Sequence, residues 1–519
     1  MASAMGGIVS QKHLALVTAG LVLAVASLPP IAALAPDLLS SPGAALQMLS
    51  SSRAATLLFH SLLIAGGATI VSLVIGVPFG VLVGRFDLIF RRAAWVIHGF
   101  PMFVPPFLLA LGWFDLLGQK GFASPMSSHL LFSGPGAVMV LSFALSPITT
   151  SLVVLSVREI DPSLEEAGLV AAGPWRVATR ILVPLSSPAI GLSAVVVFSL
   201  AFSELAVPMF LHVDAYPAAV FTRLGGVAYS PGEAAALSLP LVIVAVVLFT
   251  LERRISRRRS FATAGHGSMD RAPLPLRRWR IPLSVCAWGI TIAGTAPFFG
   301  LSIPAAAGFS RVGEWLGAAP VNSVIAASVA ATVITGFGVV LGHGLVRHEM
   351  GARLFDALAV LGFVLPASVL GVGMIGTWNR APTQAVYTTL AIITIAFIAR
   401  YGVLGIRACA AVIAQSPPEM EHAAMVFGAG YLRRLTRVLV PIHARGIAGA
   451  WLLVFVFCLR DLETPVLLYP PGAEPLTVRI FTLEANGPAG VVAALALTQV
   501  AMTAAALALG AILLRKTRT

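Results

Sequence analysis

The sequence is poor in charged residues. Only 11% of its 519 residues are Asp, Glu, Lys or Arg, whereas hydrophobic residues make up 58%. A soluble domain carries about 25% charged residues, and a soluble chain of this length would form several domains with wet surfaces. The charge content excludes such a set of soluble domains. In lipid only helices or closed barrels satisfy the backbone, and the long, non-alternating apolar runs favour helices.

Common catalytic and nucleotide-binding patterns are also missing. Lysine occurs only at Lys12, Lys120 and Lys516, and none of these lies in the G-x-x-x-x-G-K-[ST] loop that would cradle a phosphate. No Ser/His/Asp arrangement and no H-E-x-x-H motif is present. The three cysteines are too few and too scattered for a disulfide framework or a metal site. We therefore expect no enzymatic activity, no catalytic residue, no cofactor and no metal site.

Twelve apolar segments are long enough to cross a bilayer. They lie at about 13–34, 57–83, 94–117, 134–157, 187–212, 232–251, 281–304, 322–346, 354–376, 384–406, 446–469 and 489–514. The first is longer than a signal-peptide core, contains Pro29-Pro30 and lacks a clear cleavage site, so we interpret it as a retained span. The sequence thus predicts an all-α, polytopic membrane protein with about 12 transmembrane helices.

Basic residues gather in every second gap between these segments. Arginines follow the second, fourth, sixth, eighth and tenth segments, and Arg515, Lys516 and Arg518 close the chain. Loops rich in Lys and Arg stay in the cytoplasm, so both termini are predicted to be cytoplasmic. The net charge of +13 then reflects topology and contact with anionic membrane lipid, not nucleic-acid binding.

The chain contains an internal repeat. The segment R-V-A-T-R-I-L-V-P at 176–184 returns as R-R-L-T-R-V-L-V-P at 433–441, an offset of 257 positions. The same offset relates Glu204-Leu205-x-x-Pro208 to Asp461-Leu462-x-x-Pro465. Each copy holds six segments, an even number, which predicts two parallel six-helix repeats. We expect a first repeat at 1–252, a basic cytoplasmic linker at 253–280 and a second repeat at 281–519.

Each copy also carries a helix–glycine–helix loop on the predicted cytoplasmic side. In the second copy, Ser416 and Glu419 are expected to form a capping box, and the helix should stop near Gly428. In the first copy, Asp161 should start the helix and Gly173 should end it. We expect both loops to be solvated and held at the membrane surface. They either form a docking surface or merely link spans.

These loops resemble the E-A-A…G…I-x-L-P signature of permease subunits in binding-protein-dependent ABC importers. The matching residues of the first copy are Glu165, Glu166, Ala167, Ala171, Gly173, Arg176, Arg180 and Pro184. Those of the second copy are Glu421, His422, Ala423, Ala424, Gly428, Arg433, Arg437 and Pro441. The first copy departs from the signature, because it is one residue shorter between glutamate and proline and has Ala171-Ala172 where the glycine is expected.

The resemblance implies that each loop seats a coupling helix in a groove of an ATPase subunit. It implies two separate ATP-binding cassette subunits and a periplasmic or extracellular substrate-binding protein as partners, in a bacterial inner membrane. A fused pair of such permeases is most similar to the ferric-iron type. Thiamine, polyamine and phosphonate permeases are close relatives and remain alternatives.

Ionisable residues also lie inside predicted spans, where each costs at least about 2.5–3.5 kcal/mol. Arg460 and Glu463 are three residues apart and can pair on one helix face. A repeat-equivalent pair of carboxylates, each followed by a helix-breaking proline, could instead serve the passage of a cation. The candidate pathway residues are Glu204, Pro208, Asp461, Glu463 and Pro465.

Two other classes of membrane protein fit part of this pattern. An ion-coupled secondary transporter could use the buried carboxylates as proton relays, but it would have no ATPase to seat on the paired loops. A membrane-embedded enzyme would need a polar catalytic cluster at one interface and large substrate-binding loops. The longest loop is the basic linker, which contains no such cluster.

Overall fold

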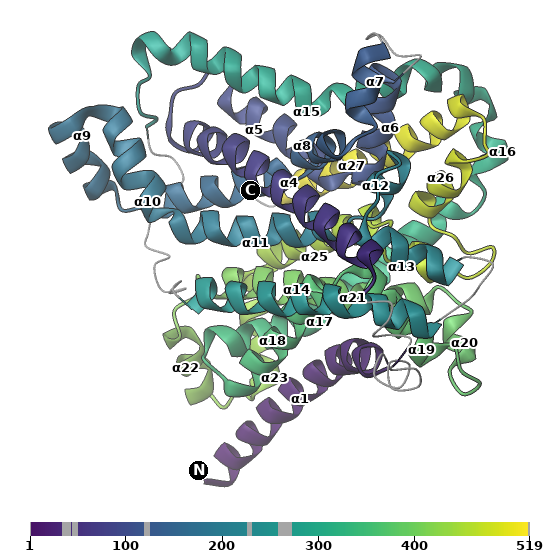
Figure 1. Ribbon diagram of the computed structural model, residues 1–519. Helices are drawn as coiled ribbons and strands as arrows, with labels where there is room; N and C mark the ends of the chain where they lie inside the picture. Colours follow the sequence, from purple (N-terminus) through teal and green to yellow (C-terminus); the bar gives the residue numbers. More distant parts are fainter. Residues whose placement is uncertain are drawn as a thin grey trace. The chain divides into compact units, whose positions relative to one another are not determined.

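The computed structural model describes residues 2–33, 43, 50–118, 125–225, 231–257 and 272–516 (Figure 1). Within these ranges the chain is helical, and its β pairing is limited to an isolated parallel bridge between Phe86 and Leu274. This confirms the all-α class. The centre of the predicted linker, residues 258–271, lies outside the described residues.

The described part of the chain has eight helices that are each long and apolar enough to cross a membrane. Four further pairs of helices meet the same test together but are bent by 62° to 107°, which raises the number of candidate spans to twelve. Every one of the twelve predicted segments overlaps one of these helices or bent pairs. The prediction of a polytopic membrane protein is therefore confirmed.

Two of the predicted spans are sharply bent instead of straight. They consist of α5 (Arg91–Gly99) and α6 (Pro106–Leu117), bent by 105°, and of α18 (Met350–Val364) and α19 (Ala367–Trp378), bent by 107°. Val104 and Leu365 lie at the two breaks in extended conformation, with ψ of 143° and 130°. Each precedes a proline, and a proline disfavours the helical conformation of the residue before it. The hydropathy of the sequence shows that both helices of each pair are apolar. It does not show that the chain changes direction between them.

One compact unit comprises residues 43–316 and 480–500. Its other main helices are α4 (Ser52–Arg85), α7 (Pro125–Leu131), α8 (Gly134–Glu159), α9 (Pro162–Val177), α10 (Val183–Leu185), α11 (Ser187–Ser203), α12 (Ala206–Phe210), α13 (Tyr216–Gly225), α14 (Pro231–Arg257), α15 (Arg280–Gly308) and α16 (Val312–Leu316). Helices α4 and α8 pack closely because Gly76 and Gly80 lack side chains. A Cβ on Gly76 would lie 2.6 Å from Thr149, which is the close approach that small residues at four-residue spacing allow between membrane helices.

The other unit comprises residues 1–42, 317–479 and 501–519. Its helices are α1 (Ala2–Ala32), α17 (Ala319–Val346), α18, α19, α20 (Gln384–Tyr387), α21 (Ala391–Ile413), α22 (Glu419–Val426), α23 (Tyr431–Arg434), α24 (Val440–Ile442) and α25 (Ala444–Arg460). Two helices are divided between the units, α26 (Leu476–Glu484) and α27 (Ala489–Lys516). Helices α17 and α21 pack as α4 and α8 do, since a Cβ on Gly338 would lie 2.8 Å from the backbone of Gly405.

The first helix of each predicted repeat packs against the bent pair of the other repeat. Helix α15 lies on α6, where a Cβ on Gly112 would meet the carbonyl oxygen of Pro297 at 2.1 Å. Helix α1 lies on α19, where a Cβ on Gly373 would meet the carbonyl oxygen of Pro30 at 2.0 Å. The packing units thus divide the chain differently from the sequence repeat, whose boundaries at 252 and 281 stay a prediction.

Candidate functional site

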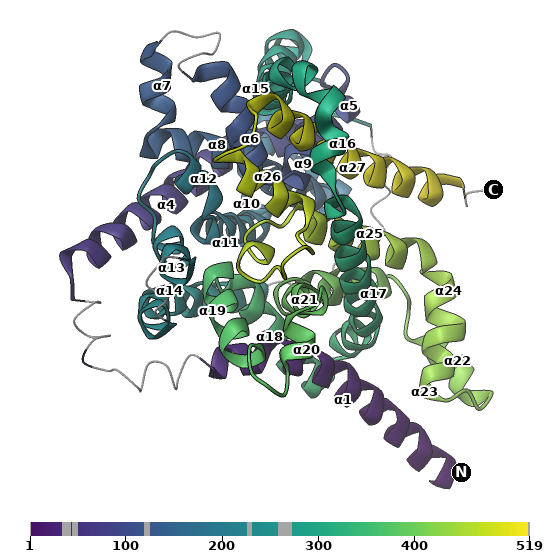
Figure 2. The same cartoon turned by 90° about the vertical axis from the view of Figure 1, so that its right-hand side faces the viewer.

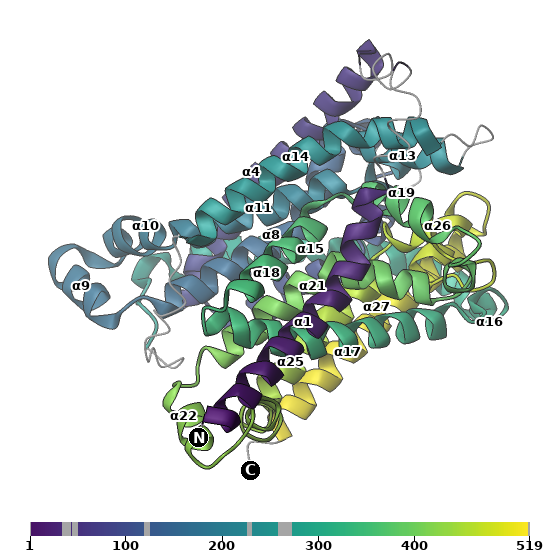
Figure 3. The same cartoon turned by 90° about the horizontal axis from the view of Figure 1, so that it is seen from below.

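The first predicted loop is the helix–glycine–helix unit that the sequence indicates. Helix α9 begins after Asp161, whose side chain accepts a hydrogen bond of 2.9 Å from the backbone nitrogen of Ser163. Gly173, with φ of 75°, interrupts the helix before Pro174, a conformation that favours glycine. A π-helical turn follows over residues 178–182. Figure 3 shows α9 and α10 at one end of their unit, beyond the end of α11.

The second loop has the same plan. Helix α22 is followed by Gly428, with φ of 78°, and then by α23 and a π-helical turn over residues 435–439. The two π-helical turns are separated by the repeat offset of 257 positions, and such turns occur often at functional sites. The predicted capping box is wrong. The helix begins at Glu419, so Ser416 lies too far upstream to cap it and instead hydrogen-bonds to His443 Nε2.

The glutamate that opens the first signature is buried, which contradicts the expectation that the loop is solvated at this position. The Glu165 residue is only 2% exposed. Arg85 Nε, at the end of α4, donates to both carboxylate oxygens of Glu165 at 3.0 Å, and Arg85 Nη2 also pairs with Oε2. Because charge-assisted, two-pronged contacts of this kind are strong and directional, they fix the base of the loop to α4.

The matching glutamate of the second copy is held in a larger polar cluster. Arg347 donates to Glu421 Oε1 from Nε at 2.9 Å and from Nη2 at 2.6 Å. His343 Nε2 lies 2.8 Å from Oε2 of the same carboxylate, and Arg434 Nη1 lies 3.9 Å from it. The Tyr431 hydroxyl is 3.4 Å from His343 Nδ1. This anchor thus joins the end of α17 to both helices of the loop.

The cluster changes the acidity of Glu421. Burial by itself would raise the pKa of this carboxyl group, but the hydrogen bonds and charges of His343 and Arg347 favour the ionised form more strongly. Together they lower the pKa of Glu421 from 4.5 to about 2. The carboxylate is therefore ionised at neutral pH, and its charge is balanced inside the loop's base.

The outer faces of both loops are exposed and partly apolar. Val170 is 92% exposed in the first loop, and Val426 and Phe427 are 85% and 91% exposed in the second. Trp175 is also exposed. The predicted signature residues that are exposed are Glu166, Ala167, Ala171, Arg176, Arg180, Pro184, His422, Ala423, Gly428, Arg433, Arg437 and Pro441. Exposed apolar side chains rimmed by arginines are typical of a protein-binding surface.

Sequence reasoning missed the anchors of these two loops. Arg85 and Arg347 were interpreted only as topology signals, because they follow apolar segments. Their partners lie 80 and 74 positions further along the chain. The available signal was that each arginine sits at the end of the same segment in its repeat. His343, within its span, and Arg434, in its loop, gave no such signal.

The two candidate pathway carboxylates have equivalent local roles. Glu204 and Asp461 each lie directly after a helix, α11 or α25, at the start of a break. Glu204 Oε1 accepts from the backbone nitrogen of Val207 at 3.2 Å, and Asp461 Oδ1 accepts from that of Thr464 at 3.3 Å. Pro208 and Pro465 follow inside the next short helical turns. Both carboxylates are buried and satisfy backbone donors that the breaks would otherwise leave free.

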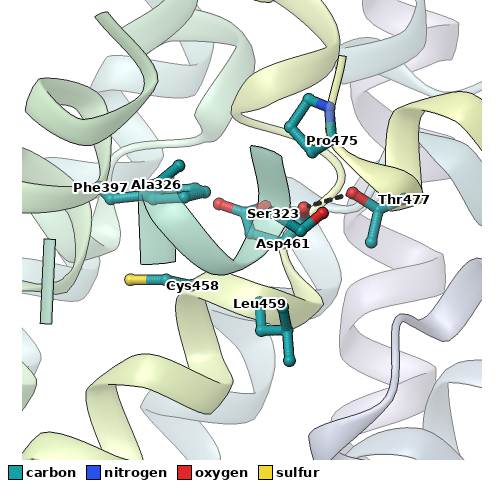
Figure 4. Close-up of a pocket in the computed structure, with 8 residues that line it drawn as sticks. All are labelled: Ser323, Ala326, Phe397, Cys458, Leu459, Asp461, Pro475 and Thr477. Atoms are coloured by element: carbon teal, nitrogen blue, oxygen red, sulfur yellow. Dashed lines mark hydrogen bonds between the residues drawn. The ribbon is translucent and has the colours of Figure 1, made fainter. Parts of the chain in front are cut away.

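Asp461 also lines a small crevice within its own unit (Figure 4). The crevice is bordered by Ser323 of α17, Phe397 of α21, and Cys458 of α25, and Thr477 donates to the Asp461 carbonyl oxygen at 3.0 Å. Asp461 Oδ2 has no hydrogen-bond partner among the described residues. This oxygen is buried, and the charge of the Asp461 carboxylate interacts with that of the Arg400 guanidinium.

A buried ion pair lies close to this aspartate. Arg400 Nη2 donates to Glu463 Oε2 at 2.5 Å, and Arg400 Nη1 donates to the Thr464 hydroxyl at 3.1 Å. The guanidinium of Arg460 lies over the ring of Phe457, 5.4 Å from its centre. Glu463 is thus bound by a neighbouring helix. Glu204 belongs to the other compact unit, so the shared pathway of Glu204 and Asp461 stays a prediction.

Comparison with known proteins agrees with the resemblance found in the sequence. The chain is 23% identical over 495 residues to the ferric transport system permease protein FbpB of Actinobacillus pleuropneumoniae, covering 87% of this chain and 70% of the relative. It is 21% identical to the Fe(3+)-transport system permease protein FbpB 2 of Haemophilus influenzae, with 84% and 85% covered. The molybdenum transport system permease protein ModB of Escherichia coli is 24% identical over 38% of this chain and 93% of its own length. No family model matches the chain.

Proposed function

We propose that this chain, a fused two-copy permease of the ABC-importer type, carries ferric iron across a bacterial inner membrane with energy from separate ATPase subunits. The observation that carries the proposal is the construction of the two loops. Each has a buried glutamate fixed by an arginine at its base and an exposed apolar face at its tip. A loop that only linked two spans would need neither feature.

The proposed occupant of each exposed face is an ATP-binding cassette subunit. Val426 and Phe427 are 85% and 91% exposed, although both side chains are apolar. Burying apolar side chains of this size in a partner is favourable. The matching tip of the first loop presents Val170 and Trp175. Two loops of one plan fit two copies of the ATPase, with the second loop offering the larger apolar contact.

Ferric iron is the proposed substrate for two reasons. The relatives that align along most of the chain are named as ferric permeases. In addition, Glu204 and Asp461 place carboxylates beside breaks in membrane helices, and hard trivalent cations prefer oxygen ligands. A substrate-binding protein outside the membrane would deliver the ion. An anionic substrate such as a phosphonate is the second candidate, because permeases for 2-aminoethylphosphonate and for molybdate/tungstate also align with parts of the chain.

We further propose that Glu204 and Asp461 contact the passing cation. Each uses one oxygen to cap a broken helix, and Asp461 Oδ2 is buried at the crevice without a hydrogen bond among the described residues, close to the charge of Arg400. A carboxylate in this poorly screened setting lowers the barrier for any cation. Binding must stay weak, because a site that holds its ion tightly cannot conduct.

Co-purification and uptake test the proposal together. The chain is solubilised in mild detergent with candidate ATPase subunits, and a complex with two ATPase copies is expected. Uptake is then measured in proteoliposomes that contain this complex, with ferric-loaded and phosphonate-loaded binding proteins in separate arms. Ferric uptake supports the proposal, phosphonate uptake would replace the substrate, and a chain that purifies without ATPase contradicts the coupling role.

The proposed orientation has a separate test. Cys286 is exposed and is first replaced by serine, whereas Cys409 and Cys458 are buried and can stay. A cysteine at exposed Asp214 should react with a membrane-impermeant thiol reagent in intact cells. A cysteine at exposed Glu419, in the second loop, should react only after the cells are opened. The reverse pattern would overturn the cytoplasmic placement of the loops and termini.

A further inference from the structure

The two arginines that anchor the loops belong to a short pattern that occurs once in each copy. The first copy has Arg85-Phe86-Asp87 at the end of α4, and the second has Arg347-His348-Glu349 at the end of α17. Both triplets read arginine, any residue, acid, and Arg347 follows Arg85 by 262 positions. The arginine of each triplet binds the signature glutamate of its own copy. The acid two residues later has no part in that contact.

In the first copy this acid binds the chain that leads into α15. Asp87 Oδ1 accepts from the backbone nitrogen of Leu276 at 2.7 Å, and the Asp87 carbonyl accepts from Arg280 Nε at 2.9 Å. Arg280 Nε also lies 3.7 Å from Asp87 Oδ2. The Leu274 nitrogen donates to the Arg85 carbonyl at 2.7 Å, which extends the contact to the anchoring arginine itself. The start of α15 is thus fastened to the residue that holds Glu165.

The same region is continuous with the core of the loop. Phe86, between the arginine and the acid, is fully buried and stacks against Trp175 of α9, with ring centres 5.9 Å apart. Leu274 and Leu276 belong to the hydrophobic cluster that also includes Val177 and Leu182 of the loop. A displacement of the start of α15 would therefore press on the loop through packed side chains and not only through the ion pair.

In the second copy the acid binds α1. Glu349 Oε1 forms an ion pair with Lys12 Nζ, one of three lysines in the whole chain. The preceding residue of α1, Gln11, lies against the loop directly, since a Cβ on Gly430 would meet its side-chain oxygen at 2.7 Å. Figure 2 shows α22 and α23 beside the N-terminal half of α1, and α1 contacts α23. Asp87 of the first copy thus binds the start of α15, the first helix of the second copy. Glu349 of the second copy binds α1, the first helix of the first copy.

We propose that Asp87 and Glu349 are positioning residues that tie α15 and α1, respectively, to the two coupling loops. The first helix of each repeat then moves together with the loop of the other repeat. ATP-driven motion of a loop is carried into the helices of the opposite repeat through one arginine–acid triplet. This inference rests on the proposed function, because it assigns the path by which the loops act on the membrane helices.

The Lys12–Glu349 pair gives the sharper test, because both side chains are partly exposed and can be exchanged without opening the core. The variants are Lys12→Glu, Glu349→Lys and the double exchange, each reconstituted with ATPase subunits and ferric-loaded binding protein. The readout is iron transported per ATP hydrolysed. Each single variant should lower this ratio about two- to fivefold, the scale of one part-exposed ion pair, and the double exchange should restore it. The amount of bound ATPase should not change.

Matched controls separate positioning from general stability. The exchange of Arg311 and Glu314, an exposed pair in the other unit, should leave the ratio at the wild-type value. In the first copy, Asp87→Asn keeps an acceptor for the Leu276 nitrogen but removes the charge facing Arg280, so it should lower the ratio while α15 stays folded.

Three results would overturn the inference. If the single variants keep the wild-type ratio of iron transported to ATP hydrolysed, the pair has no part in coupling. If the single variants lower this ratio and the double exchange does not restore it, the Lys12–Glu349 contact itself is not responsible. A fall in ATPase binding and thermal stability at constant ratio would make the pair purely structural. If wild-type protein shows no ATP-dependent iron uptake, the proposed function fails together with this inference. If the wild type is active, a negative result with the variants contradicts only the role of the pair.

Discussion

Arg347 donates two hydrogen bonds to Oε1 of Glu421, from Nε at 2.9 Å and from Nη2 at 2.6 Å. The arginine caps the end of α17, and the glutamate lies in the first turn of α22. This contact makes the base of the loop part of the helical body, while Phe427 at the tip remains free for a partner. Substitutions at the base and at the tip should therefore have different consequences.

Removing one side of a buried anchor should unfold the loop locally. In Glu165→Ala, the guanidinium of Arg85 loses its carboxylate partner while buried, and breaking such a pair costs about 3–5 kcal/mol. Hydrogen exchange of residues 162–182 in detergent should accelerate accordingly. The double variant Arg85→Met, Glu165→Leu removes both charges and should exchange more slowly than the single variant. Equal rates for wild type and Glu165→Ala would contradict the anchoring role.

The second anchor should make the loop acid-sensitive. The pKa of Glu421 is about 2 in the folded protein and 4.5 ordinarily, so its ionised form stabilises the fold at pH values above 4.5. That contribution is lost as the pH falls from 4.5 toward 2, because the carboxylate then takes up a proton. The protection factors of residues 419–442 against hydrogen exchange, which correct for the intrinsic pH dependence of amide exchange, should fall over this window in wild type. In Glu421→Gln this fall should be absent, and a fall equal to that of wild type would show that another group governs it.

Substitutions at the tips should weaken ATPase binding without loosening the fold. Phe427→Ser removes a 91% exposed aromatic side chain and should raise the dissociation constant of the ATPase about tenfold, the effect of losing one well-buried contact. Val170→Ser in the first loop should have a smaller effect, because valine buries less area. Surface plasmon resonance with the purified ATPase measures both. Unchanged affinity in the double variant would exclude these tips as the docking surface.

Neutralising the two pathway carboxylates should slow iron uptake. Glu204→Gln and Asp461→Asn keep an oxygen that can accept from Val207 or Thr464, so the helix breaks should persist. Uptake should fall in each single variant and further in the double variant, while ATPase binding stays at the wild-type level. Glu463→Gln is the contrasting variant, because it removes the carboxylate that accepts from buried Arg400 while Asp461 keeps its charge, and it should lower thermal stability. Normal uptake in the double variant would make Glu204 and Asp461 structural.

The sequence predicted the helices of this protein better than their contacts. Hydropathy located all twelve candidate spans, because a long apolar run is a local property. Asp161 and Gly173 were likewise readable, since capping and left-handed conformations depend on a few neighbouring residues. The bends before Pro105 and Pro366 were missed, because the mean hydropathy of a segment does not report the direction of its helix axis.

The base of each loop was the main error of interpretation. Glu165 and Glu421 look like surface residues in a polar segment, yet both are buried. Their burial depends on arginines that lie 80 and 74 positions away, and no local pattern reports such a pairing. Arg176 and Arg433 were correctly predicted to lie on the surface. Their exposure follows from the local helices to which they belong.

The central claim is that ATP hydrolysis by subunits seated on the two loops drives iron through this chain. Its most direct test is radioactive ferric-iron uptake by proteoliposomes that contain the chain, the ATPase and ferric-loaded binding protein. Uptake should require ATP inside the compartment that holds the loops, and it should persist when a proton ionophore dissipates the proton gradient. Uptake that proceeds without ATP and collapses with the ionophore would identify a secondary transporter and contradict the account.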